Sequence, residues 1–361
     1  MNIQISYLNY FRKNSLKIIL ALVFIAQFLF IIYFNLACLE NHLGYDSSWT
    51  YLRAILMWKE HNLFSSSFSE QTNIFLDSSM PLASLLYGMI GNVFIAYGIS
   101  NIIIICLILF VLRSILIQCN LSCAIRLIGY NLFLCPYLFN GFSISNDLGY
   151  FSNILCGPAF YAVRLLLVLL IINNLLDAIL FKFNRLKLFS TFILSFIAGI
   201  SSGIFIILIV MMPYLTYVIE KALWKNHFKI FLKRDALFVY LCILFTLAGK
   251  LTSQFLLSLN TIDSSRTWTS IDNIWKNIGA VIQGLMKLIN VLPLYSNTNE
   301  SILSIMGIMR LFVLYTFFVL IVSLIYHCIK IKNYFLSQWE PILIFLNIVG
   351  INFIIFSLLC Q

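Results

Sequence analysis

Charged side chains are scarce in this chain, since Asp, Glu, Lys and Arg together make up 10% of its 361 residues. Acidic residues are the rarer sign, with 13 in all. A soluble domain needs a more polar surface, so this shortage excludes an ordinary water-soluble globular protein. No basic and aromatic pattern indicates nucleic-acid binding. No phosphate-binding loop, dinucleotide fingerprint, Ser-His-Asp arrangement or HExxH motif occurs either, which argues against the common soluble-enzyme chemistries.

Apolar sequence is abundant instead, with 61% hydrophobic residues and a mean hydropathy of +0.97. Runs such as SLKIILALVFIAQFLFIIYF are apolar on every side over the ~20 residues that a helix needs to cross a bilayer. We therefore predict an all-α, polytopic membrane bundle of about nine or ten transmembrane helices. Residues 1–361 are expected to form a single integral membrane module.

The nine cysteines lie mostly inside apolar runs, where cysteine serves as a small buried hydrophobe. Cys119 and Cys123 are four residues apart, but no further ligand accompanies them. This cysteine pair therefore does not indicate a metal site.

The net charge of +10 is explained by Lys and Arg gathered in short loops, the distribution typical of cytoplasmic loops. The first apolar run, about Leu16–Cys38, is predicted to be a retained helix that leads out of the cytoplasm, with the N-terminus inside. Residues 39–80 then form a first outer loop. It holds five of the 13 acidic residues. Within it, Tyr45–Phe64 predicts an interfacial helix with Tyr45, Trp49, Leu52, Leu56 and Leu63 on its apolar side.

The apolar stretch Pro81–Gln118 is interrupted by Gly88, Gly91 and the segment Tyr97–Asn101. Two helices, or one crossing with a re-entrant piece, both fit this pattern. Leu127–Phe139 is expected to lead outward again.

A second outer segment, 140–158, contains Asp147, and Tyr161–Leu176 is expected to return inward. Leu188–Val218 is predicted to be a helical hairpin hinged at GISSG, residues 199–203. Residues 260–306 form a late outer loop in which Ile271–Leu292 has the pattern of a second interfacial helix. Leu311–Tyr326 and Ile342–Leu359 are the last predicted spans.

Two stretches, GYDSSWTYLRAI at 44–55 and FLDSSMPLASLLY at 75–87, resemble the first outer loop of the GT-C superfamily. These are integral membrane glycosyltransferases that use lipid-phosphate-linked sugars. IAGISSGIF is also similar to a glycine-marked helix pair of that family. Where related enzymes often carry a basic residue before Pro-Leu, this chain has Ser78, Ser79 and Met80. The matching residues are Asp46, Ser47, Ser48, Tyr51, Arg53 and Ala54 in the first stretch, and Asp77, Pro81 and Leu82 in the second.

The resemblance implies an inverting glycosyltransferase of the bacterial inner membrane, working on its outer face. It would move a hexosyl or pentosyl group from a polyprenyl-phosphate donor to a glycan, lipid or protein acceptor. Asp46 is the expected general base. Asp77 is expected to hold the acceptor, to position Asp46 or to help bind a metal. No cofactor is expected beyond the lipid-linked donor, and a divalent metal is left open. The residues expected to contact substrate are Tyr51, Arg53, Asp147, Arg266 and Trp268.

Structural alternatives stand beside these roles. Asp46 and Asp77 also suit helix caps, and the outer-side cations Arg53, Arg266 and Lys276 suit lipid headgroups. A non-catalytic or flippase-like component of surface-polysaccharide assembly is the alternative function. An O-antigen-type polymerase would be favoured by arginine-rich outer loops. It ranks lower, because Arg266 is the sole arginine within residues 260–306.

Overall fold

The computed structural model describes residues 2–41, 45–62, 78–135, 154–157, 159, 161–180, 185–206, 210–224, 234–256 and 271–288, with Leu311, Leu314, Tyr315, Val319 and Asn347. Every secondary-structure element within these residues is helical. The chain divides into two compact units, one formed by Met1–Pro136 with Ile144–Asp177 and the other by Tyr137–Ser143 with Ala178–Gln361.

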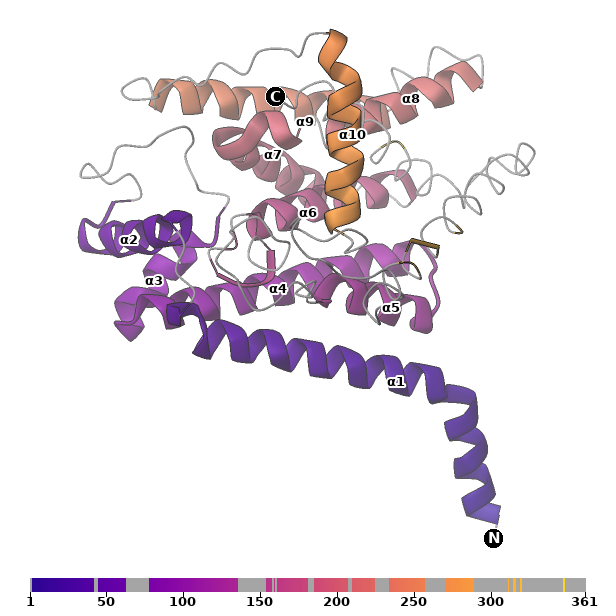
Figure 1. Cartoon of the computed structure of the whole chain (residues 1–361). Helices are drawn as coiled ribbons and strands as arrows, with labels where there is room; N and C mark the ends of the chain where they lie inside the picture. Colours follow the sequence, from indigo (N-terminus) through magenta and orange to yellow (C-terminus); the bar gives the residue numbers. More distant parts are fainter. Residues whose placement is uncertain are drawn as a thin grey trace. The chain divides into compact units, whose positions relative to one another are not determined.

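The first unit is built around the pairing of α1 with α4 and α5, and α2 and α3 gather near the end of α1 that leads into α2 (Figure 1). A short 3-10 turn, Leu39–Asn41, follows α1. The helices of this unit are α1 (Asn2–Ala37), α2 (Tyr45–Lys59), α3 (Met80–Ile90), α4 (Val93–Gln118), α5 (Cys123–Leu134) and the part of α6 (Ala162–Leu180) up to Asp177.

Helix α1 contains the segment Ser15–Ala37, which is long and apolar enough to cross a membrane. The predicted first span at about Leu16–Cys38 is therefore confirmed as an apolar helix. Leu16, Leu22 and Leu29 on this helix are 58%, 61% and 58% exposed. Such a surface would be unfavourable in water, whereas the lipid tails of a bilayer cover it.

Val93–Gln118 in α4 and Ala236–Ser253 in α9 also have the length and composition of membrane spans, so the described residues contain three candidate spans. They define a helical membrane protein. The sequence predicts about nine or ten spans. Two of them, Leu311–Tyr326 and Ile342–Leu359, lie almost entirely outside the described residues. Helix α5 has 12 residues and so a length of about 18 Å, short of the ~30 Å hydrocarbon core.

The stretch 81–118 forms two helices that meet at Gly91 and Asn92. Gly91 has a φ of +78°, a left-handed conformation that suits glycine, and it ends α3. The Asn92 side chain accepts hydrogen bonds from the amides of Phe94 and Ile95 at 2.9 and 3.2 Å, and so caps α4. Because α3 has 11 residues, about 16 Å, α4 is the one helix of this stretch with the length of a crossing. The expected interruption at Tyr97–Asn101 is wrong, since this segment lies inside α4.

Helices α4 and α6 run in the same direction. Asn101 bonds to Gly157, 56 residues later, and Gln118 bonds to Asn173, 55 residues later. An offset that stays nearly constant along both segments is the mark of a parallel pair. The sequence left the number of crossings in 81–118 open, and the parallel pair fits the alternative with one net crossing. Ile104, Ile108, Ala159 and Ala162 form the apolar core between them.

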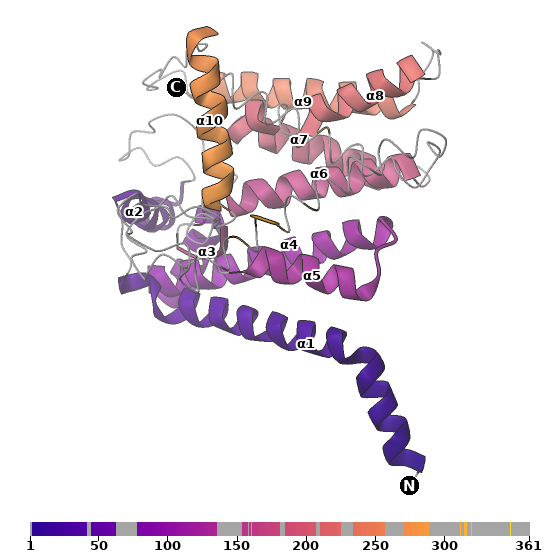
Figure 2. The same ribbon diagram turned by 45° about the vertical axis from the view of Figure 1, so that its right-hand side comes forward.

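In the second unit, α7 (Arg185–Ile206) and α9 (Arg234–Leu256) lie side by side (Figure 2). The predicted hinge at GISSG is wrong, because α7 continues through Gly199 and Ser201. These helices touch through their glycines. A Cβ at Gly199 would overlap the carbonyl oxygen of Thr246, and one at Gly249 would overlap that of Phe196. Small residues at such a contact are typical of membrane helix pairs, because they let the two backbones approach.

The second unit also contains α8 (Met212–Trp224) and α10 (Ile271–Leu288). Nδ2 of Asn347 donates a 2.9 Å hydrogen bond to the Glu220 carboxylate on α8. Helix α10 begins at the predicted residue, and its Trp275 is 79% exposed. The predicted second amphipathic helix is therefore confirmed as a helix.

Candidate functional site

Helix α2 packs against α3 and α4 through a face that differs from its predicted apolar side. Tyr51, Ala54 and Met57 are buried, whereas Leu52 is 50% exposed. The Tyr51 ring meets the Tyr97 ring edge-on, with centroids 4.7 Å apart. The helix from Tyr45 is confirmed. Leu52, on the apolar side predicted for an interfacial helix, does not face the protein. Tertiary packing selected the neighbouring face because aromatic residues of α4 are available there.

Two hydrogen bonds hold α2 and the start of α3 on the same face of α4. The Tyr97 hydroxyl donates to the Thr50 carbonyl oxygen at 3.0 Å, and the Ser100 hydroxyl donates to the Ser79 carbonyl oxygen at 3.1 Å. Positions 97 and 100 are one turn apart on α4 and therefore lie on one side of it. The two stretches that carry the family resemblance are thus brought together in the fold.

Arg53 projects into this packed region and is 2% exposed. Its guanidinium carbon lies 5.3 Å from the centroid of the Trp49 ring, a cation–π arrangement. Burial lowers the pKa of the Arg53 guanidinium, because removal from water disfavours the charged form, and Tyr97 opposes this shift with a smaller effect. Arginine keeps its charge at neutral pH even so. The sequence grouped Arg53 with outer-side cations that suit lipid headgroups, whereas the structure buries its side chain.

The N-terminus of α3 is closed off from solvent. Ser78, Ser79 and Met80 are buried, and the Met80 amide donates to the Ser78 hydroxyl oxygen at 3.3 Å. Pro81 lies in the first turn, where its missing N–H costs little. The resemblance leads us to expect a basic residue at these positions, and here small hydroxyl side chains fill a packed interior.

A pair of buried amides, which the sequence analysis missed, adjoins this region. Nδ2 of Asn101 on α4 donates to Oδ1 of Asn35 on α1 at 3.0 Å. The two side chains are 0% and 1% exposed. A sequence signal existed, because each asparagine interrupts an apolar run, and polar residues within membrane helices are costly to bury.

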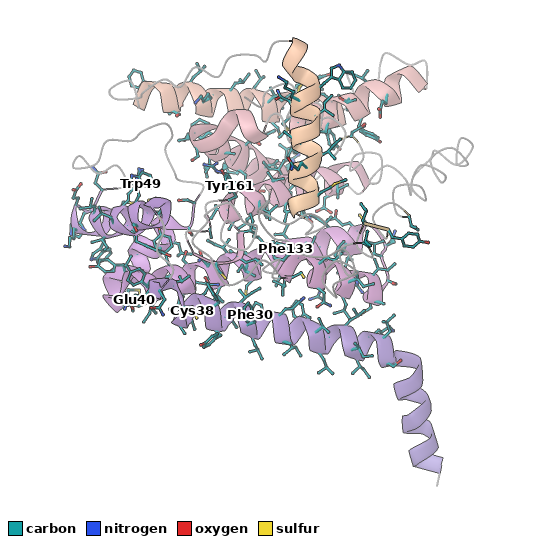
Figure 3. The ribbon with its side chains drawn as sticks, viewed as in Figure 1. Phe30, Cys38, Glu40, Trp49, Phe133 and Tyr161 are labelled. Carbon is teal, nitrogen blue, oxygen red and sulfur yellow. The ribbon has the colours of Figure 1, made fainter. Side chains whose placement is uncertain are left out.

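These side chains form one buried polar layer around residues 97–101 of α4. In Figure 3 the labels Cys38 and Glu40 show where the chain leaves α1, and Trp49 shows α2. Such a layer in an apolar bundle is suited to bind a polar ligand or to fix the register of the helices. The layer comprises Asn35, Thr50, Arg53, Ser78, Ser79, Ser100 and Asn101.

The predicted site residues fall into two groups. Asp46 lies in the first turn of α2, one turn before Thr50, and Tyr51 and Arg53 lie further along the same helix. The other four predicted site residues lie outside the described residues. They are Asp77, Asp147, Arg266 and Trp268.

Within the part of the chain that the structure describes, no group of three His, Cys, Asp or Glu side chains could hold a metal ion. His61 is exposed, and its ring meets that of Trp58 at a centroid distance of 5.9 Å. No described histidine therefore enters the buried polar layer.

No protein-family model matches the chain, and neither the curated proteins nor the solved structures include a significant match.

Proposed function

We propose that this chain is a GT-C-like integral membrane glycosyltransferase that transfers a sugar from a polyprenyl-phosphate donor to an extracytoplasmic glycan, lipid or protein. One observation supports the proposal most. Thr50 and Ser79, from the two stretches that resemble the family, bond to one face of α4. The start of α2, with Asp46, and the segment that follows Asp77 in sequence therefore converge beside the buried charge of Arg53.

The chemistry of the transfer suits these residue types. The acceptor hydroxyl oxygen bonds to the anomeric carbon while the bond from that carbon to the phosphate oxygen breaks. Asp46 takes the hydroxyl proton as general base. Arg53 holds the phosphate of the departing polyprenyl phosphate, because guanidinium groups pair well with phosphate oxygens.

The remaining predicted residues complete this proposal. Asp77 is the second acidic residue of the site. The residues that contact donor or acceptor are Tyr51, Asp147, Arg266 and Trp268. In the proposed topology the chain is one membrane module with a cytoplasmic N-terminus. The site then opens to the outer face of the bacterial inner membrane, and α10 lies at that interface.

The test compares membranes that contain equal amounts of wild type, Asp46→Asn and Asp77→Asn, with Glu40→Gln as the matched control. Glu40 is an exposed carboxylate in the same predicted loop but outside the proposed site. Transfer of labelled sugar from polyprenyl-phosphate donors is measured. Asp46→Asn is expected to lose about 100-fold or more, since general bases contribute ~10²–10⁴-fold, while Glu40→Gln retains activity.

Two results would count against the proposal. If Asp46→Asn transfers sugar at the wild-type rate, Asp46 caps α2 and is not the base. If the wild type transfers nothing from any donor offered and a surface-glycan phenotype survives Asp46→Asn, the chain is a non-catalytic assembly component.

A further inference from the structure

The short segment Ile154–Gly157 is held by both buried asparagines. Nδ2 of Asn35 donates to the Leu155 carbonyl oxygen at 2.9 Å and lies 3.2 Å from Sγ of Cys156. Nδ2 of Asn101 donates to the Gly157 carbonyl oxygen at 2.9 Å. Because Asn101 also donates to Asn35, two helices and this segment share one connected set of hydrogen bonds.

This arrangement does more than join two helices. Asn131 on α5 shows the simpler case, since its Nδ2 donates to the Leu20 carbonyl oxygen on α1 and to its own helix at Leu127, each at 2.9 Å. Asn35 likewise donates to its own helix at Ile31, at 3.0 Å. In addition, Asn35 and Asn101 each donate a hydrogen bond to a backbone carbonyl that lies outside their own helices.

The close contact of the two helices allows this geometry. A Cβ at Gly98 would overlap the Asn35 carbonyl oxygen, so glycine brings α1 and α4 together one turn before Asn101. At that separation the amides reach each other and the segment at the same time. The segment follows residues 140–153 in sequence, which contain the predicted site acid Asp147.

We propose that Asn35 and Asn101 are positioning residues that clamp Ile154–Gly157 and thereby fix the end of the stretch that carries Asp147. This inference rests on the proposed function, in which Asp147 contacts substrate. The asparagines touch neither donor nor acceptor. They act through the backbone that they hold, beside the face of α4 that anchors α2 and α3.

Cys156 reports directly on the clamp, because its side chain is 1% exposed within the clamped segment. The full-length protein in detergent is treated with a membrane-permeant maleimide, and the alkylation rate at Cys156 is followed by peptide mass spectrometry. Asn35→Ala and Asn101→Ala are expected to raise this rate about 10-fold, the effect of losing a buried hydrogen bond. The matched control Asn131→Ala removes an interhelical amide of the same type and is expected to leave the Cys156 rate near that of the wild type.

The second measurement is sugar transfer by the same variants. Loss of the clamp is expected to lower kcat by about 10–100-fold with little change in the KM for the donor, since a small misplacement of a residue that orients the substrate can cost ~10²-fold. Asn131→Ala is expected to retain kcat. If a single substitution prevents folding, the double variant Asn35→Leu with Asn101→Leu removes both amides together, so that neither amide is left buried without the other.

The two measurements separate the possible failures. Wild-type alkylation of Cys156 in both alanine variants, or in the folded double variant, would overturn the clamp. Faster alkylation with unchanged kcat would overturn the positioning role. A wild type that transfers no sugar would overturn the proposed function together with the positioning role, and the alkylation rates would still decide the clamp.

Discussion

Gly98 of α4 lies so close to α1 that a Cβ at this position would overlap the backbone carbonyl oxygen of Asn35. This contact sets the separation at which Asn35 and Asn101 bond to each other. In lipid, helices gain little from hydrophobic association, so close backbone packing and interhelical hydrogen bonds carry much of the specificity. The α1–α4 crossing uses both.

Gly98→Ala is expected to lower the free energy of unfolding by about 1–3 kcal/mol, because the added methyl group forces the two backbones apart. Gly279→Ala is the matched control, since nothing lies within 4 Å of a Cβ at that position of α10. The control is expected to be neutral or slightly stabilising, as alanine favours helix over glycine. Thermal unfolding in detergent measures both, and equal stability of the two variants would contradict the α1–α4 contact.

Gly199→Ala and Gly249→Ala are each expected to destabilise the α7–α9 pair by about 1–3 kcal/mol, because each methyl group meets the backbone of the opposite helix. The two glycines share one contact, so the first substitution already separates the helices there. The double variant is therefore expected to lose less stability than the sum of the single variants. Full additivity in thermal unfolding would mean that the glycines act independently.

Tyr97→Phe removes the hydroxyl that donates to the Thr50 carbonyl oxygen. The carbonyl is then left without this donor, and the expected cost is about 1–3 kcal/mol. Since the same bond holds α2 on α4, the variant is also expected to lose sugar transfer. Tyr33→Phe is the control, because Tyr33 is 62% exposed on α1. Unchanged stability and transfer in Tyr97→Phe would show that the ring contacts alone hold α2.

Arg53→Lys tests the buried charge through its pH dependence. Burial lowers the pKa of the Arg53 guanidinium, yet arginine stays charged over the working range. Lysine starts from a lower pKa, and the same burial lowers it further, so it releases its proton as the pH rises. The variant is therefore expected to lose activity as the pH rises, whereas the wild type loses none through this group. If the variant and the wild type have parallel pH profiles, Arg53 does not bind the phosphate.

The sequence alone determined the class of protein, the first helix, and the amphipathic segments from Tyr45 and from Ile271. These features depend on local composition and period, since an apolar run of ~20 residues has few alternatives to a membrane helix. The roles of Asp77, Asp147, Arg266 and Trp268 stay predictions, and so does that of Asp46.

Only the tertiary structure decided which face of α2 is buried, that GISSG continues a helix, and that Asn35 meets Asn101. The periodicity of apolar residues distinguishes the two faces of a helix. Which face is buried against the protein depends on the neighbouring helix. A glycine reads the same in sequence whether it bends a helix or admits a neighbouring backbone, as Gly199 does. A buried amide is recognisable only when its partner, 66 residues away for Asn35 and Asn101, has been brought to it by the fold.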